Sequence, residues 1–197
     1  MGKLMVAFGD SNTRFYYGDT MTPAPLEEAW PARLETMLRE RGVDIAVRNE
    51  GYPGEQADFA MEKFQDVTQG ADLVAVGFGT NDAKKLEVPL GEYLSEISDV
   101  IEQADQRKLP MLLLGIPWFD QTLAGPEAQA RLPIWNEALA SLCQQLDIPF
   151  LDLYGAFKDD PERWYNERET PKRHLSAEAH RQVARMALEP VMKLLDR

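Results

Sequence analysis

Five short apolar runs, spread along the whole chain, constrain its fold more than any other feature. They comprise residues 3–9 (KLMVAFG), 44–51 (DIAVRNEG), 72–79 (DLVAVGFG), 110–117 (PMLLLGIP) and 148–154 (IPFLDLY). Three of them are nearly continuous in Val, Leu, Ile and Ala, a composition typical of strands that are buried on both faces of a parallel sheet. The runs therefore predict five parallel strands.

Stretches with a helical pattern separate these runs. The segments LEEAWPARLETMLRERG and GEYLSEISDVIEQADQRK, for example, carry apolar residues at three- and four-residue spacing. Gly42 ends the first segment, as a glycine does just beyond a helix C-terminus, and residues 175–197 form a last helix. Alternating strands and helices make right-handed crossovers. We therefore expect an α/β fold, a three-layer α/β/α sandwich with a flavodoxin-like, doubly wound sheet of five parallel strands.

Length, charge and cysteine content limit the classes of protein. The 197 residues suffice for one hydrophobic core, so we expect a single domain over residues 1–197. The net charge is −12, and nucleic acid or an anionic membrane surface would need clustered Lys and Arg instead. Cys143 is alone, which excludes an intrachain disulfide. The first apolar run is too short for a signal peptide and no run could span a membrane, so we expect a cytoplasmic protein.

Residues capable of chemistry follow the predicted strands. In doubly wound sheets, ligands bind beyond the carboxyl ends of the strands. Ser11 follows the first strand in FGDSNT, Gly51 ends the second in NEGYPG, and Asn81 follows the third in GTND. His174, in PKRHLSAEAH, lies between the fifth strand and the last helix. Their order and placement favour one site at a single edge of the sheet.

Each of these residues also has a purely structural interpretation. Ser11 could cap a helix, and so could Asn81. Gly51 could be a turn residue, and His174 an ordinary surface side chain. Together, however, they meet the needs of acyl transfer. A serine hydroxyl requires an imidazole to remove its proton, and the developing oxyanion requires preorganised donors. The set as a whole therefore favours catalysis.

These segments resemble the SGNH (GDSL-type) hydrolase superfamily of serine esterases and lipases. GDSN matches its first block, the Gly51 segment its second, GTND its third and HLS its last, so the resemblance spans residues 9–176. It implies a carboxylic ester hydrolase with Ser11 as nucleophile and His174 as general base. It also implies an oxyanion hole formed by the backbone N–H groups of Ser11 and Gly51 and by the side chain of Asn81.

The chain departs from the family pattern at the acid of the triad. The family usually places an Asp three residues before the histidine, where this chain has Pro171. The third member holds the imidazole in the right tautomer. We expect the main-chain carbonyl of Pro171 to do this, with Glu169 as second choice. Further candidates are Glu167, Asp159 and Asp160. The alternative is a catalytically weakened, ligand-binding member of the family.

Residues around the nucleophile and after the fourth strand could bind the substrate. Asp10 is expected to organise the nucleophile turn by hydrogen bonding. Trp118 and Phe119, and Tyr16 beside Tyr17, could line an acyl or aryl pocket, although aromatic side chains also pack in cores. The long charged segment 154–173 could form a lid beside His174. We expect a small-molecule substrate, a neutral short-chain or aryl ester. O-acetyl sugars, thioesters and a lysophospholipase-type activity remain alternatives.

Other functional classes fit the sequence less well. The loop GYPGEQ lacks the lysine of a P-loop, which disfavours a phosphate binder of the same fold. The two histidines are separated by LSAEA, which is not a zinc-binding helix motif, so we expect no metal and no cofactor. His180 is assigned to a polar face of the last helix, and Cys143 to a buried position. A pure interaction module would leave Ser11 unreactive toward a serine-directed phosphonate.

Overall fold

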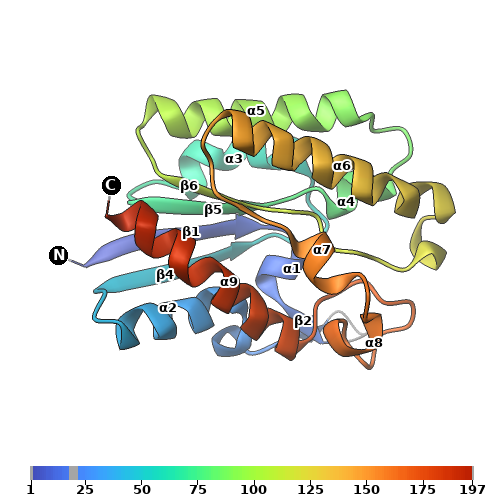
Figure 1. Cartoon of the computed structure of the whole chain (residues 1–197), viewed down its shortest axis with the longest axis horizontal. Helices are drawn as coiled ribbons and strands as arrows, with labels where there is room; N and C mark the ends of the chain where they lie inside the picture. The colour runs from blue at the N-terminus through green and yellow to red at the C-terminus, as the bar shows by residue number, and fades with distance from the viewer. Residues whose placement is uncertain (1, 18–21, 197) are drawn as a thin grey trace.

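A parallel sheet occupies the middle of the molecule (Figure 1). The computed structural model describes residues 2–17 and 22–196. The strands of the sheet are β1 (Lys3–Gly9), β4 (Ile45–Gly51), β5 (Leu73–Gly77), β6 (Met111–Leu114) and β7 (Phe150–Leu151). They lie in the order β4-β1-β5-β6-β7, and every neighbouring pair is parallel. Counted along the chain this is the order 2-1-3-4-5, which confirms the flavodoxin-like sheet predicted from the sequence.

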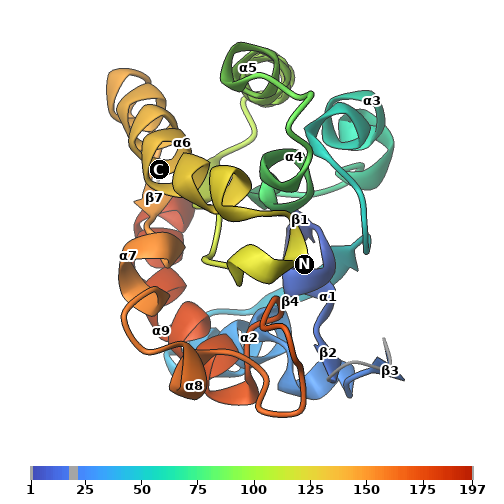
Figure 2. The same cartoon turned by 90° about the vertical axis from the view of Figure 1, so that its right-hand side faces the viewer.

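Helices cover both faces of this sheet (Figures 1 and 2). One layer contains α2 (Trp30–Glu40) and α9 (Ala177–Leu195). The opposite layer contains α3 (Ala57–Val67), α5 (Leu90–Gln106) and α6 (Pro126–Gln145). Each layer encloses its own hydrophobic cluster against the sheet. The α/β/α sandwich is therefore confirmed.

Burial on both faces explains why the strand sequences lack an alternating pattern. In β1, Val6 and Phe8 belong to the cluster beneath α3, α5 and α6, whereas Met5 and Ala7 belong to the cluster beneath α2 and α9. All four side chains are completely buried. A strand with a helical layer on each side has no solvent face, so polar residues are absent from both sets of positions.

Short elements complete the described part of the chain. They are α1 (Ser11–Arg14), β2 (Tyr16–Tyr17), β3 (Thr22–Pro23), η1 (Leu26–Glu28), α4 (Thr80–Lys84), η2 (Gln121–Leu123), α7 (Leu153–Phe157) and α8 (Pro161–Trp164). The antiparallel pair of β2 and β3 was not predicted, because two-residue strands are too short to show a period. Within the described ranges, no helix combines the length and the apolar character needed to cross a membrane.

The register of the sheet aligns three strand ends. Gly9, the last residue of β1, pairs with Gly51 at the end of β4 and with Gly77 at the end of β5. The segments that follow these strands therefore leave the sheet from one level edge. Ser11 lies in the first of these segments and Asn81 in the third, so the fold brings together residues that are about 70 positions apart in the sequence.

Candidate active site

Ser11 begins α1 immediately after β1. The residue before it, Asp10, caps this short helix: Asp10 Oδ1 accepts a hydrogen bond of 2.8 Å from the N–H of Asn12. The N–H of Asp10 itself donates to the carbonyl of Gly77 at 3.2 Å, which anchors the turn to β5. The cap is thus Asp10 and not Ser11, so the serine hydroxyl is left for another interaction.

Two hydrogen bonds connect Ser11, His174 and Glu169 in a row. Ser11 Oγ lies 3.0 Å from His174 Nε2, and His174 Nδ1 lies 2.9 Å from Glu169 Oε1. All three residues are buried. A neutral imidazole that donates from Nδ1 to the carboxylate presents the lone pair of Nε2 to the serine hydroxyl. This geometry suits a general base that removes a proton from Ser11.

The segment that leads into α9 holds His174 in place. The N–H of Asn166 donates to the His174 carbonyl at 2.9 Å, and Tyr165 forms an antiparallel bridge with Leu175. The N–H of Leu175 donates to Asn12 Oδ1 at 3.1 Å. Because Asn12 follows Ser11 and Leu175 follows His174, this bond fixes the separation of the serine and the histidine.

Glu169, rather than the main chain of Pro171, contacts His174 Nδ1, and this corrects our first expectation. The Glu169 side chain is completely buried, and its Oε2 accepts from the N–H groups of Arg173 (3.2 Å) and His174 (2.8 Å). Burial by itself raises the pKa of Glu169, but the hydrogen bonds from His174 and from these main-chain groups outweigh burial and lower it. Glu169 is therefore a carboxylate at neutral pH.

The position of Glu169 explains why sequence reasoning ranked it second. It lies five residues before His174, two residues farther than the usual acid, and a glutamate is one methylene longer than an aspartate. The loop of residues 169–174 folds back so that its own N–H groups meet the carboxylate. A tight loop of this kind leaves no periodic signal in the sequence TPKRHLS. The longer side chain of Glu did indicate that an acid farther from the histidine could reach its ring.

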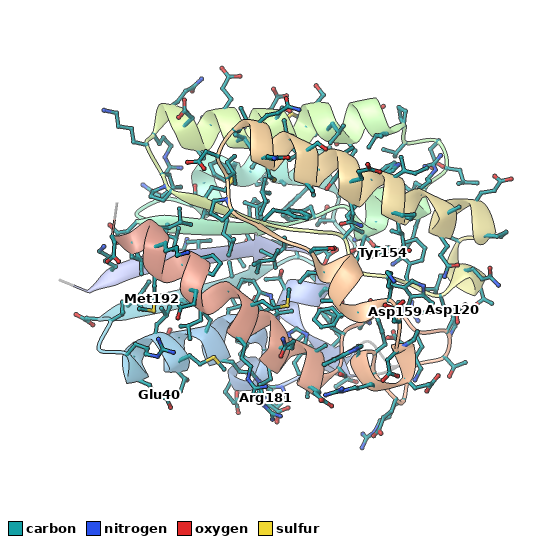
Figure 3. The ribbon with its side chains drawn as sticks, in the orientation of Figure 1. Glu40, Asp120, Tyr154, Asp159, Arg181 and Met192 are labelled. Atoms are coloured by element: carbon teal, nitrogen blue, oxygen red, sulfur yellow. The ribbon has the colours of Figure 1, made fainter. Side chains whose placement is uncertain are left out.

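The other acidic candidates lie away from the histidine. Asp159 is exposed at the protein surface, where it pairs with Lys158 at 2.5 Å (Figure 3). Asp160 and Glu167 are likewise exposed. An acid that faces solvent cannot hold a buried imidazole, so these residues do not fit the role that we considered for them.

Two of the three predicted oxyanion donors have an N–H hydrogen that is not bonded to an acceptor in the described part of the chain. The first N–H groups of a helix lack intrahelical acceptors, and no described residue accepts from the N–H of Ser11. Asn81, in α4, donates one amide hydrogen to the carbonyl of Glu55 at 2.8 Å. A side-chain amide carries two hydrogens, so one remains for a ligand.

The third predicted donor, Gly51, requires a correction. Its N–H donates to Asn49 Oδ1 at 3.1 Å, whereas the N–H of the next residue, Tyr52, donates to the carbonyl of Gly9 in β1 at 2.7 Å. Successive N–H groups of a strand point in opposite directions, so the N–H of Gly51 points away from β1, and Asn49 Oδ1 already accepts from it. A Cβ atom at Gly51 would lie 2.3 Å from the main-chain N of Arg14. The residue is small because α1 packs against β4 there.

Gly54 has the free N–H that Gly51 lacks. Residues 52–55 form a turn closed by a hydrogen bond from the N–H of Glu55 to the carbonyl of Tyr52, with Pro53 and Gly54 in the middle. Gly54 has φ of +84°, as the third residue of a type II turn requires. No described residue accepts from its N–H. The dipeptide Pro-Gly was the sequence signal for this turn, which we did not use.

The sequence pattern of the GDSL-like Lipase/Acylhydrolase family matches residues 7–182. The chain belongs to this family. The match extends from β1 through the Ser11, Asn81 and His174 segments into α9, which confirms the resemblance to GDSL-type hydrolases seen in the sequence. Membership of the GDSL-like family also makes the chain a carboxylic ester hydrolase.

Known proteins similar to this GDSL-like chain include one from a plant and two solved bacterial structures. The GDSL esterase/lipase WDL1 of Oryza sativa subsp. japonica is 24% identical to this chain. The alignment, including gaps, is 218 residues long and covers 98% of this chain and 77% of that protein. The M. smegmatis aryl esterase has a TM-score of 0.83 at 16% identity, over 98% of this chain and 100% of the other. A carbohydrate acetylesterase family member from Sinorhizobium meliloti has a TM-score of 0.80 at 19% identity, over 99% and 100%. These two structures share the fold of the GDSL-like chain.

Aromatic residues proposed for the pocket differ in their surroundings. The ring of Tyr16 lies 5.9 Å from the ring of His174, so it flanks the site of this GDSL-like protein. The side chain of Phe119 is completely buried in the core beneath α5 and α6 and offers no surface to a substrate, which corrects our expectation. Trp118 is partly buried with its ring 5.3 Å from the ring of Tyr165, in contact with both hydrophobic clusters. The side chain of Tyr17 lies outside the described part.

His180 is buried, whereas we expected it on a polar face. Its Nδ1 accepts a hydrogen bond of 3.1 Å from the N–H of Trp30 at the start of α2, and its ring lies 4.1 Å from that of Phe15. Burial lowers the pKa of His180 to about 3, so the ring is neutral. In this GDSL-like protein His180 therefore supports the fold and joins α9 to α2. We missed it because the buried face of α9 is broad enough to include both Ala179 and His180.

Proposed function

We propose that this GDSL-like protein hydrolyses esters through an acyl-enzyme on Ser11, with His174 as general base and Glu169 as the acid of the triad. The observation that carries the proposal is the hydrogen-bonded row of Ser11 Oγ, His174 Nε2, His174 Nδ1 and Glu169 Oε1, with contacts of 3.0 and 2.9 Å. Such a row activates a hydroxyl that is otherwise a weak nucleophile.

The chemistry proceeds in two halves. His174 Nε2 takes the hydroxyl proton while Ser11 Oγ bonds to the ester carbonyl carbon, and the carbonyl oxygen becomes an oxyanion. As the tetrahedral intermediate collapses, the bond to the alkoxy group breaks, and His174 returns the proton to the leaving alcohol. Water then attacks the acyl-enzyme with the same base, which releases the carboxylic acid and restores Ser11. Glu169 stabilises the imidazolium that forms twice in this cycle.

The proposed oxyanion hole consists of the N–H groups of Ser11 and Gly54 and the side-chain amide of Asn81. The first two N–H groups have no acceptor among the described residues, and Asn81 retains one amide hydrogen. Donors that are fixed in advance stabilise the developing charge without reorganisation, and loss of one such donor typically lowers kcat by roughly 10²–10³-fold. Gly54 replaces Gly51 in this proposal, because the N–H of Gly51 already donates to Asn49 Oδ1.

For the substrate we propose a small ester with a short acyl chain or an aryl group, including O-acetyl sugars. The two bacterial proteins of the same fold, an aryl esterase and a carbohydrate acetylesterase family member, support this range. The ring of Tyr16 beside His174 could provide a wall for an acyl or aryl group. Thioesterase or lysophospholipase-type activity is the alternative within the same chemistry. The buried carboxylate at His174 Nδ1 supports an active enzyme over the alternative of a catalytically weakened member. A cytoplasmic location stays a prediction.

The decisive experiment compares hydrolysis of p-nitrophenyl esters, from acetate to octanoate, by the native protein, Ser11→Ala and Ser141→Ala. Ser141 lies exposed on α6 and bonds only to its own helix, so it is a matched control. We expect activity in the native protein and the control and a loss of at least about 10³-fold in Ser11→Ala. A phosphonate adduct at Ser11, detected by mass spectrometry, would identify the nucleophile independently. Equal activity of Ser11→Ala and native protein would overturn the proposal.

A further inference from the structure

We propose that Arg173 is a positioning residue of this site. Its guanidinium holds the Glu169 carboxylate in the orientation that His174 requires, and it bonds to the same carboxylate oxygen as the imidazole ring. The inference rests on the function proposed above. It concerns a residue that precedes the histidine directly in the sequence KRHLS, to which the sequence pattern assigned no role.

The contacts of Glu169 show how closely the guanidinium and the imidazole are coupled. Glu169 Oε1 lies 2.7 Å from Arg173 Nε and 2.9 Å from His174 Nδ1, so one oxygen serves both side chains. Glu169 Oε2 accepts from the main-chain N–H groups of the same two residues. Four donors thus surround one carboxylate, which is about as many as its two oxygens can accommodate. The Glu169 side chain has no exposed surface, whereas that of Arg173 is 31% exposed.

This arrangement has two physical consequences. The first is orientation: a buried carboxylate with a charge-assisted bond on each side of Oε1 cannot rotate away from His174 Nδ1. The second is electrostatic: the positive charge of Arg173 opposes a positive charge on the neighbouring ring, because both compete for the same oxygen. Without Arg173 the imidazole would be the only side chain bonded to Glu169 Oε1.

Other charged groups act on the same pair and remain in the protein when Arg173 is substituted. Asp10, which follows β1, interacts electrostatically with His174, and Lys84, from α4, interacts with Asp10, Glu169 and Arg173 itself. Buried His180, from α9, also interacts with His174 and is neutral at pH 7. Because Lys84 also senses the charge of Arg173, a substitution that keeps that charge is needed beside one that removes it.

The test measures kcat, KM and the pH dependence of kcat/KM for Arg173→Gln and Arg173→Lys with the best p-nitrophenyl ester. We expect kcat to fall about tenfold in Arg173→Gln with little change in KM, because one charge-assisted bond is lost at a partly exposed side chain. The acid limb of kcat/KM should also shift, whereas a merely structural role of Arg173 would leave it in place. Arg173→Lys keeps the charge and should recover part of both effects.

Arg163→Gln is the matched control. Arg163 also pairs with a glutamate, Glu178, at 2.7 Å, but both partners are exposed and belong to α8 and α9. It should leave kcat and the pH profile unchanged. If Arg173→Gln keeps both the native kcat and the native acid limb while Ser11→Ala is inactive, the role of Arg173 is wrong and the proposed function stands. A loss of thermal stability with an unshifted acid limb would show a merely structural role and would also overturn the inference.

Discussion

Among single residues, Glu169 combines complete burial with a negative charge and a hydrogen bond to a histidine ring. In the triad proposed above, Glu169 has the role that family members usually give to an aspartate three residues before the histidine. A buried carboxylate is tolerated here because every donor around it is used. The conformation of the loop, and not the sequence distance from His174, therefore determines which carboxylate contacts the histidine.

Glu169→Gln tests whether the Glu169 carboxylate orients His174. The amide keeps the shape of the side chain but lacks the charge, and it can offer an N–H to His174 Nδ1, which favours the wrong tautomer. We expect kcat for the p-nitrophenyl ester to fall by about 10³-fold or more, close to the loss in His174→Ala. Glu167→Gln, two residues away and exposed, is the control and should remain active. Retention of a tenth or more of native kcat in Glu169→Gln would return the orienting role to a main-chain group.

At the scale of elements, helix α2 depends on two terminal arrangements of different origin. Its C-terminus is local: the N–H of Gly42 donates to the carbonyl of Arg39, and that of Val43 donates to Leu38, which is the Schellman motif. Its N-terminus lacks a side-chain cap from its own segment, and His180 of α9 accepts from the N–H of Trp30 instead. The sequence indicated the first arrangement, through Gly42, but not the second.

Gly42→Ala tests the local arrangement. Gly42 has φ of +81°, and an added Cβ would meet no atom within 4 Å, so the cost is backbone strain alone. We expect the free energy of unfolding to fall by about 1 kcal/mol in urea denaturation. Gly91→Ala in α5 is the matched control. It also has open space around the Cβ, but its backbone is helical, so alanine should be neutral or stabilising by up to about 1 kcal/mol. Equal effects at both glycines would contradict the prediction.

At the scale of the whole molecule, two buried titratable groups influence stability in opposite directions as pH changes. Burial lowers the pKa of His180 to about 3, so between the unfolded value near 6.5 and pH 3 the unfolded chain binds more protons and stability falls as pH falls. Burial raises the pKa of Asp82 to about 6, so its contribution decreases as pH rises from about 4 to 6. The two partly cancel, and only a variant can separate them.

His180→Gln is the variant that separates them. Glutamine can still accept from the N–H of Trp30 but does not titrate. As pH falls from about 7.5 to 5, we expect His180 to lower the unfolding free energy of the native protein by about 2 kcal/mol. The figure follows from about 1.36 kcal/mol for each pH unit below the unfolded pKa of about 6.5. The difference in stability between native protein and variant should therefore change by this amount over that interval, as measured by urea denaturation at both pH values. A constant difference would show that His180 does not titrate on unfolding.

Local patterns of residue types were sufficient to predict the architecture and the placement of most of the candidate site. Continuous apolar runs and helical periods are local patterns, and they were sufficient to predict five parallel strands between helical layers. A strand that is buried on both faces is apolar at nearly every position, so its sequence alone reveals it. The rule that ligands bind beyond the carboxyl ends of parallel strands then placed Ser11, Asn81 and His174 at one edge. The structure brings Ser11 and His174 into hydrogen-bond contact at that edge.

The hydrogen-bond partners of these residues, in contrast, depend on how distant segments of the chain pack together. The choice of Glu169 over Pro171 depends on how the loop of residues 169–174 folds over its own carboxylate. The choice of Gly54 over Gly51 depends on which way one N–H points from β4, and the burial of His180 depends on α2 packing against α9. Hydrogen-bond direction and side-chain burial are set by segments remote in the chain, so no local pattern of residue types records them.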